Sequence, residues 1–521
     1  MPVHDHSRLL YNAVVALDAG RFERAIQICS VGLNRNCEPE VQTKLRLMRA
    51  EAEISTDAWA GAQKDCERLL ELGPSAQAFA LLARSLFEQG RQTEAQHAIE
   101  SALAKESSTL GHVRLYTEIL LRSGQHEAAV RACKQACALD SSLATIKLLL
   151  RALAAAGKQT ELIATLERLV PPGTRDADIW CTLGDAHNSL GQDELAVAAF
   201  THALGLDPGR GDAHCGLGYA FLRQGNYAQG FLHHEHRQGT SGLVSRLGVP
   251  SWQGESLASK HLLVWTEQAM GDMIQFARYV PLASRLAESV TFKVPKVLIR
   301  VFSSNREMGR LTSEHPGFGA ADVQALVMSL PHRLGLGDDV GAATVPYLWP
   351  ETELVQRWKA RLPQGRLIAL SWQGNPAFAG EPWRSIPLER LAPVVAHHKR
   401  VFRFLSLQKN HGREQLGSIG FGRDIIDLGD EIDNEGDAFV DSLAILASVE
   451  LLLTTDTSLA HLAGAANIPT WLMLPFACVW RWGNGDSSTI WYPSTRIFRQ
   501  RSPGDWSSVI NDVLSALSER H

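Results

Sequence analysis

The hydrophobic pattern of the first 237 residues is that of paired helices that repeat along the chain. Glycines at 90, 124, 157, 191 and 225 stand 33 or 34 residues apart, Gly20 precedes them, and Asp57 fills the gap in the series. A self-similar period of this length is typical of arrays in which each unit is one helix–turn–helix. The pattern predicts an α-helical solenoid of about seven helix pairs over residues 1–238, with units beginning near residues 6, 43, 76, 110, 143, 177 and 211.

The unit that begins at Ala177 has large, small and helix-ending residues at regular places. They are Trp180, Leu183, Gly184, Ala196, Phe200, Ala203 and Pro208. Small residues let two antiparallel helices approach closely, aromatic side chains fill the space beside them, and proline ends the second helix. These positions resemble those of the tetratricopeptide family. The resemblance implies a superhelix whose concave face binds a partner protein.

The inner positions of the first helices carry mostly charged side chains. They are Glu51, Arg84, Glu118, Arg151, Asp185 and Tyr219. Alternating charges fit a recognition surface, but a face that is only solvated is the more frequent meaning of such a pattern. The pattern leaves both interpretations open.

After Arg237 the helical period stops, and residues 239–258 are rich in glycine and serine, which predicts a linker. Short apolar runs then alternate with helical patterns, so we expect parallel sheets with crossover helices in two lobes, 259–350 and 351–500. The expected strands are 261–266, 289–294, 325–330, 367–372, 401–407, 425–428, 451–454 and 470–474. The predicted fold class is an α-solenoid followed by twin Rossmann-like α/β lobes, which bind ligands between the carboxyl ends of their sheets. An amphipathic helix is expected within residues 501–521.

The segment TTDTSLAHLAGAANIPTWLMLP, residues 454–475, follows an apolar run directly. A strand ending here would deliver Asp456, Thr457 and Ser458 to the first turn of a helix, where unpaired N–H groups and the helix dipole favour a phosphate. His461 follows Thr457 by four residues on the same helix face, and a partly exposed imidazole there would donate to a phosphate or a sugar hydroxyl. The alternative is that Asp456 or Thr457 only caps the helix and His461 packs beneath the sheet.

Three further polar clusters follow predicted strands. They are SWQGNP with Trp372, Gln373 and Asn375, followed by RSIPL with Arg384; SLQK with Gln408 and Lys409; and WRW with Arg481 and Trp482. Amides offer hydrogen bonds, tryptophan offers a stacking face, and a guanidinium suits phosphate. Each cluster alone is explained as well by a capped loop or an exposed charge. Because the carboxyl ends of parallel strands meet at one edge of a sheet, the clusters together predict a ligand site.

The first lobe contributes WTEQAMGDMIQFARYVP, residues 265–281. Gly271 allows a tight turn, and Asp272 begins a predicted helix that runs to about residue 287. Asp272 is then either an ordinary N-cap or a carboxylate facing the anion site, where it would take the proton of an attacking hydroxyl.

Taken in order, EQAMGDMIQFARYVP, SWQGNP…RSIPL, SLQK and DTSLAHLAGAANIPTWLMLPFACVWRW resemble segments of the bacterial tetratricopeptide-repeat glycosyltransferases, whose catalytic half is similar to the heptosyltransferases. The resemblance implies a GT-B fold with an acceptor lobe, a nucleotide-sugar lobe, and a last helix that crosses back to the first lobe. It implies Asp272 as catalytic base. The implied donor-binding residues are Asp456, Thr457 and His461, the amides around Ser458 and Leu459, and the more weakly matched Arg384, Gln408 and Lys409. We add Trp372, Gln373, Asn375, Arg481 and Trp482 to these as donor contacts, because they belong to the same strand-end clusters.

Together these features predict an inverting, metal-independent glycosyltransferase that moves a sugar from a nucleotide sugar to an acceptor protein held by the repeats. Flagellin is a candidate acceptor by analogy with related repeat transferases. The alternatives are a scaffold whose transferase lobes are vestigial, and transfer to lipopolysaccharide or another glycan. No metal-binding Asp-x-Asp pattern stands near the site, so we expect neither a metal nor a cofactor beyond the nucleotide-sugar substrate.

Bulk composition changes this picture little. The 521 residues are 45% hydrophobic and 21% charged with a net charge of −5, which argues against a general attraction to nucleic acid or anionic membranes. We expect a cytoplasmic protein without a membrane span, because long apolar runs and a secretory signal are both missing from the sequence. The eight cysteines form no Cys-x-x-Cys pair and are expected to be reduced.

Overall fold

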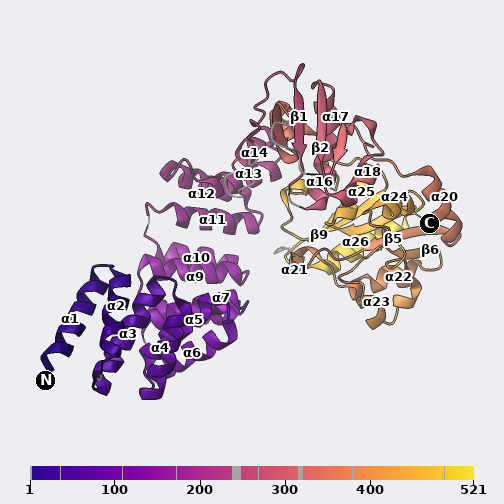
Figure 1. Cartoon of the computed structure of the whole chain (residues 1–521). Helices are drawn as coiled ribbons and strands as arrows, with labels where there is room; N and C mark the ends of the chain where they lie inside the picture. Colours follow the sequence, from indigo (N-terminus) through magenta and orange to yellow (C-terminus); the bar gives the residue numbers. More distant parts are fainter. Residues whose placement is uncertain are drawn as a thin grey trace. The chain divides into compact units, whose positions relative to one another are not determined.

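The structure is a computed structural model (Figure 1) and describes residues 3–35, 37–107, 109–171, 173–237, 248–267, 269–314, 321–377, 381–485 and 487–520. The chain divides into two compact units, Met1–Ala186 and His187–His521. The boundary falls within one helix of the repeat array, α11 (Ala177–Ser189).

Helices alternate in pairs up to residue 234. They are α1 (Val3–Asp18), α2 (Phe22–Leu33), α3 (Pro39–Ser55), α4 (Trp59–Leu72), α5 (Ala76–Glu88), α6 (Gln92–Lys105), α7 (Leu110–Arg122), α8 (His126–Leu139), α9 (Leu143–Ala155), α10 (Gln159–Leu169), α11 (Ala177–Ser189), α12 (Asp193–Leu206), α13 (Gly211–Arg223) and α14 (Tyr227–His234). From α5 on, the first helix of each pair begins at the residue that the period predicts, whereas α1 and α3 begin slightly earlier.

The repeated glycines mark one turn conformation. The backbone is left-handed at Gly90, Gly124 and Gly191, with φ of +78°, +72° and +70°. Glycine adopts this conformation without the steric cost that other residues meet. Asp57 stands at the same place in its pair with φ of +58°, and aspartate is one of the few other residues that enter this region readily.

The small residues of the pattern lie where paired helices touch. Ala62, Ala95 and Ala129 are fully buried. A Cβ atom on Gly218 of α13 would stand 3.0 Å from the backbone oxygen of Gly230 in α14. The two helices of the last pair therefore pack backbone to backbone at this position.

The second unit contains two parallel sheets. The first has strand order β3-β2-β1-β4 and the second β10-β9-β8-β5-β6-β7. The strands are β1 (His261–Trp265), β2 (Ser289–Lys293), β3 (Arg310–Thr312), β4 (Val323–Leu326), β5 (Arg366–Ser371), β6 (Phe402–Ser406), β7 (Ile425–Asp427), β8 (Leu451–Thr455), β9 (Thr470–Leu474) and β10 (Thr495–Arg499). The central strands β5, β8 and β9 are buried almost throughout, as is usual for parallel strands covered on both faces.

Short helices connect the strands. The α-helices are α16 (Met270–Phe276), α17 (Val280–Ser284), α18 (Ile299–Phe302), α19 (Leu330–Arg333), α20 (Thr352–Arg361), α21 (Glu381–Arg384), α22 (Ala392–His398), α23 (Gln415–Ser418), α24 (Val440–Leu446), α25 (Ser458–Ala465) and α26 (Trp506–Ser518). The 3₁₀ turns are η1 (Ala277–Tyr279), η2 (Lys296–Leu298), η3 (Arg306–Met308), η4 (Val327–Ser329), η5 (Val340–Ala342), η6 (Leu388–Leu391), η7 (Gly422–Asp424) and η8 (Trp480–Trp482). The single helix expected from residue 272 is thus α16, η1 and α17 in succession.

Two expectations about connections are wrong. The predicted linker 239–258 lies partly outside the described residues, but its part from residue 248 packs on the first sheet: Trp252 is buried and its backbone N–H donates to Gln324 of β4 at 2.7 Å. The last helix, α26, does not return to the first lobe. Its residues Val509 and Val513 are buried with the side chains of the second sheet, because β10 leads directly into it.

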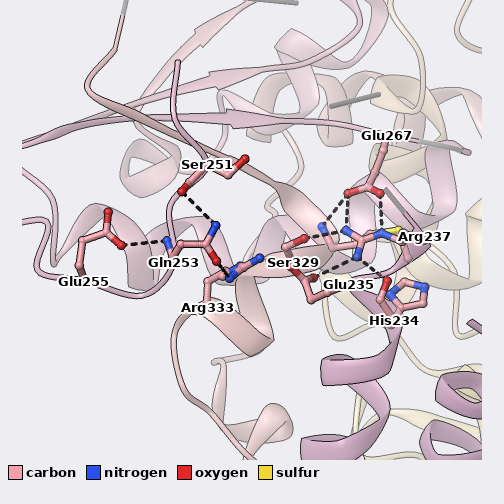
Figure 2. Close-up of polar contacts among 10 residues, drawn as sticks. His234, Glu235, Arg237, Ser251, Gln253, Glu255, Glu267, Ser329 and Arg333 are labelled. Atoms are coloured by element: carbon pink, nitrogen blue, oxygen red, sulfur yellow. Dashed lines mark hydrogen bonds and ion pairs between the residues drawn. The ribbon is translucent and has the colours of Figure 1, made fainter. Parts of the chain in front are cut away.

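Arg237 holds the end of the repeats to the first lobe (Figure 2). Its guanidinium donates to both carboxylate oxygens of Glu267, at 2.8 and 2.9 Å, and to the Ser329 hydroxyl at 2.8 Å. Arg237 is 4% and Glu267 5% exposed. The Arg333–Glu235 pair lies beside them, at 2.6 Å. Because Glu267 follows β1 and Ser329 lies just after β4, this network joins the last helix pair to two strands of the sheet.

Glu267→Gln should lower the free energy of unfolding by about 3 kcal/mol, because it removes the bidentate partner of the buried Arg237 guanidinium and leaves only the single bond to Glu235, at 3.1 Å, as counter-charge. Chemical denaturation followed by tryptophan fluorescence measures the loss. The control is Glu255→Gln, in an exposed glutamate of the same region, which should change the unfolding midpoint little. Similar losses for the two variants would contradict the anchoring role of the Arg237–Glu267 pair.

Candidate functional site

The loop between β8 and α25 contains an open helix turn. Thr457 stands at the N-cap position, yet its side chain makes no capping hydrogen bond, and its hydroxyl lies 3.3 Å from that of Thr454. Thr457 and Ser458 are half-buried. The first N–H groups of a helix have no partner within the helix and carry the positive end of its dipole. The side chain of Thr457 therefore does not cap α25, and the first turn of this helix is suited to an anion.

Asp456, buried beside this turn, lies among charged side chains from several segments. Burial raises the pKa of its carboxyl group, and the nearby carboxylate of Asp272 adds to the rise. Arg384, the indole N–H of Trp482 and Arg481 act in the opposite direction. The structure thus brings one acid from the first lobe together with an acid and two arginines that follow strands of the second sheet.

His461 lies behind Asp456 and is buried. Its Nδ1 atom is 2.9 Å from the Tyr492 hydroxyl, and its ring stacks on Trp482 with centroids 5.1 Å apart. Its Nε2 atom is 3.9 Å from Asp456 Oδ1. Burial lowers the pKa of His461 well below its usual value, and Arg481 lowers it further, so the ring is neutral at pH 7. The expectation of a partly exposed, phosphate-binding imidazole is wrong; the ring instead supports Asp456 and Trp482.

Asp272 reaches the site because α16 packs directly against α25. A Cβ atom on Gly271 would stand 3.0 Å from His461 Cδ2 and 3.6 Å from Ser458 Oγ. Asp272 is the third residue of α16, whose N-cap is Ala269, so it is not the N-cap of its helix. Its carboxylate forms an ion pair with Arg481, and the two side chains are 14% and 11% exposed. The predicted base and the predicted anion turn are neighbours.

Gln408 and Lys409 have structural partners instead of facing an open site. The Gln408 amide oxygen accepts from the backbone N–H groups of Trp372 and Gln373, at 3.0 and 3.1 Å, which fixes the end of β5. The Lys409 ammonium donates to the carbonyls of Ile432 and Asp433, at 2.6 and 2.8 Å. Both polar groups hold loops in this structure, and their role as donor contacts stays a prediction.

The polar side chains of the SWQGNP cluster also have hydrogen-bond partners within the protein. Trp372 is fully buried and its indole donates to the Gly412 carbonyl at 3.1 Å, so it offers no stacking face. The Gln373 side chain accepts from Gln415 at 2.9 Å. Asn375 is exposed and accepts from the N–H of Ala377 at 3.0 Å, which closes a local turn.

Arg384 and Leu459 complete the predicted set. Arg384 is half-buried at the end of α21, and its charge acts on both Asp456 and His461. The Leu459 side chain is buried, so only its backbone belongs to the open turn. Of the predicted site residues, those that converge are Asp272, Arg384, Asp456, Thr457, Ser458, Leu459, His461, Arg481 and Trp482.

Sequence reasoning missed the support beneath the site. Arg278 is buried, with its guanidinium 4.6 Å from the ring centre of Tyr492 and 5.0 Å from that of Tyr347, and it donates to the Trp491 carbonyl at 2.8 Å. It therefore holds the tyrosine that bonds His461. The sequence signal that pointed to this role was Arg278 itself, a charged residue inside the apolar stretch FARYVP.

The last repeat also borders the site. Helix α13 packs against η8, which carries Arg481, and Phe231 of α14 meets Trp480 edge to face at 5.8 Å. Arg223 of α13 bonds Asp193 at 2.6 Å, and Asn484 bonds the same carboxylate. The segment after β9 is thus held by repeat residues.

Among the described residues, no group of three or more His, Cys, Asp or Glu side chains is arranged to hold a metal ion. Within the same residues, no helix has the length and apolarity needed to cross a bilayer.

Two stretches, residues 81–144 and 177–210, match models of the tetratricopeptide repeat. The N-terminal half is a tetratricopeptide-repeat array. Protein FlbA of Caulobacter vibrioides is 25% identical over 369 residues, which cover 64% of this chain and 60% of FlbA. The chain thus spans less than two thirds of the length of that relative.

Solved repeat proteins show weaker similarity. The C-terminal part of a TPR repeat-containing protein from Cytophaga hutchinsonii is 11% identical and covers 46% of this chain and 97% of its own, with a TM-score of 0.38. MamA from Desulfovibrio magneticus is 19% identical and covers 33% and 99%, with a TM-score of 0.30. TM-scores of this size carry no argument about the function of this chain.

Asp456→Asn should stabilise the protein more at pH 7 than at pH 4. The folded protein raises the pKa of Asp456, so the parent loses stability as pH rises through that value, and asparagine does not titrate. Thermal unfolding of variant and parent between pH 4 and 7 measures the difference.

Asp505→Asn provides a control of opposite sign. Hydrogen bonds from Ser508 lower the pKa of Asp505, so the parent gains stability from this carboxylate as pH rises and the variant does not. Parallel trends for the two variants would contradict the assignment of Asp456 as a buried, poorly compensated acid.

Proposed function

We propose that the chain is an inverting, metal-independent glycosyltransferase of the GT-B type that uses a nucleotide sugar. The observation that supports it is the meeting of Asp272, from the first lobe, with Arg384, Arg481 and the open α25 turn of the second. A carboxylate next to a cationic anion site is what transfer from a diphosphate-linked sugar requires.

In the proposed reaction the oxygen of an acceptor hydroxyl attacks the anomeric carbon of the donor. The new C–O bond forms as the bond to the diphosphate breaks, and the nucleoside diphosphate leaves with the electron pair. Asp272 takes the hydroxyl proton. Arg384, Arg481 and the first turn of α25 stabilise the charge that develops on the diphosphate. Attack opposite the leaving group inverts the anomeric configuration.

The repeats support a protein as acceptor, since solenoids of this kind present extended surfaces to polypeptides. Flagellin is the candidate we favour. The close packing of α13 against η8 adds support, because it puts the surface of one repeat next to the segment that bears Arg481.

Thermal unfolding with UDP-, GDP-, ADP- and dTDP-linked sugars tests donor binding. One of them should raise the unfolding temperature, because a ligand at a hundred times its Kd stabilises the folded state by about 2.7 kcal/mol. Incubation of that donor with flagellin should then release nucleotide and label the protein. Stabilisation by none of them would favour a scaffold with vestigial lobes, and label in lipopolysaccharide instead of protein would overturn the choice of acceptor.

Asp272→Asn should reduce sugar transfer about 10²- to 10⁴-fold, because it removes the general base without changing the shape of the side chain. Release of nucleotide in the presence of acceptor measures the rate. Glu288→Gln, an exposed acid of the same lobe, should leave the rate unchanged. Full activity of the Asp272 variant would end its assignment as base.

Arg384→Met should raise the Kd for the nucleotide product about tenfold or more, because charge-assisted bonds to phosphate are lost. Isothermal calorimetry measures the affinity. Arg390→Met, in an exposed arginine that follows on the same segment, is the matched control and should bind as the parent does. Equal affinities for the two variants would place the diphosphate elsewhere.

A further inference from the structure

Arg481 forms a bond across the site that conflicts with the proposed chemistry. Its guanidinium, on η8 after the second sheet, pairs with Asp272 of α16 in the first lobe. Both side chains are largely shielded from water, so solvent screens the pair weakly. A carboxylate oxygen engaged by a guanidinium cannot at the same time accept a hydrogen bond from an acceptor hydroxyl along the same direction.

The arginine also has unused bonding capacity beside the anion turn. Its Nε atom is buried and has no hydrogen-bond partner among the described residues. Its guanidinium lies over the Trp480 ring, 4.7 Å from the centre, which orients the planar group. Its charge acts on Asp456 and on His461, which flank the open first turn of α25. Arg481 therefore interacts with the proposed base, Asp272, and lies close enough to the α25 turn for its charge to act there.

A diphosphate is the stronger partner for this group. It carries more negative charge than one carboxylate, and a guanidinium fork matches two phosphate oxygens well. Asp272 and an anion at the first turn of α25 would compete for the same guanidinium. Binding of the anion therefore weakens the bond from Arg481 to Asp272, and that bond in turn weakens binding of the anion.

We propose that Arg481 exchanges partners during the reaction, holding Asp272 in the donor-free protein and the diphosphate in the donor complex. Donor binding then releases the base, so the nucleotide sugar binds before the acceptor hydroxyl can be deprotonated. When the nucleoside diphosphate leaves, the ion pair forms again and the base is occupied. This inference rests on the proposed function and assigns Arg481 the role of coupling the two halves of the site.

The test measures the Kd of UDP, GDP, ADP and dTDP by isothermal calorimetry for the parent and three variants. If Asp272 competes for Arg481, Asp272→Asn should tighten binding of the preferred nucleotide by about 5-fold or more, within the usual range of coupling between sites. Arg481→Gln should weaken binding. The double variant should bind the nucleotide like Arg481→Gln alone, because Asp272 and the nucleotide no longer compete when the guanidinium is absent.

Glu307→Gln is the matched control. It removes one negative charge from the first lobe at an exposed ion pair with Arg285, at 2.7 Å, and should leave the Kd unchanged. Circular dichroism and unfolding temperature show whether each variant is folded; Arg481→Lys replaces Arg481→Gln if the latter unfolds, and it should weaken binding less.

The outcomes separate two failures. Binding of a nucleotide by the parent with no gain in Asp272→Asn, or a gain that persists in the Arg481→Gln background, would overturn the exchange of partners and leave the glycosyltransferase proposal standing. Absence of binding in the parent and in every variant would overturn both.

Discussion

The contact between α16 and α25 is the constraint on which the site depends. It is possible because Gly271 has no side chain: a Cβ atom there would come closer to the His461 ring than a side chain normally approaches. Asp272 is the next residue along the chain, so the contact that joins the two lobes also delivers the carboxylate to Arg481. The backbone of one residue thus decides whether the acid of one sheet meets the arginines of the other.

The last helix pair belongs physically to the α/β lobes. Arg237 with Glu267, Asn484 with Asp193, and the aromatic contact of Phe231 with Trp480 each join repeat helices to segments that surround the site. A buried ion pair adds little to the net stability of the folded protein, but removing one partner leaves an unpaired buried charge and lowers the stability strongly. Such pairs therefore fix the position of the segments that they join. This is why the division into compact units falls inside α11 and not at the end of the repeats.

Much of the fold could be predicted from the sequence, because its signals are local. The glycine period reflects a left-handed turn in each helix pair, and the buried parallel strands are continuous apolar runs. The edge strands β3 and β10 were missed because β3 has only 3 residues and because arginines break the apolar pattern of β10. In the site, Asp272 and the α25 turn could be predicted from strand ends, whereas the partners of Lys409 and His461 could not. Those partners, the carbonyls near residue 432 and the hydroxyl of Tyr492, lie more than 20 residues away in sequence.

The contacts of α13 and α14 with the α/β lobes determine where the chain can be shortened. A fragment that starts after residue 238 would lack α13 and α14. The faces of Trp480 and Phe276 that pack on Phe231 would then be in contact with water. Exposed apolar surface of this kind promotes aggregation. Repeats ahead of α12 touch none of these aromatic rings among the contacts described. Units at the amino-terminal side of the array could therefore be added or removed without exposing these rings to water.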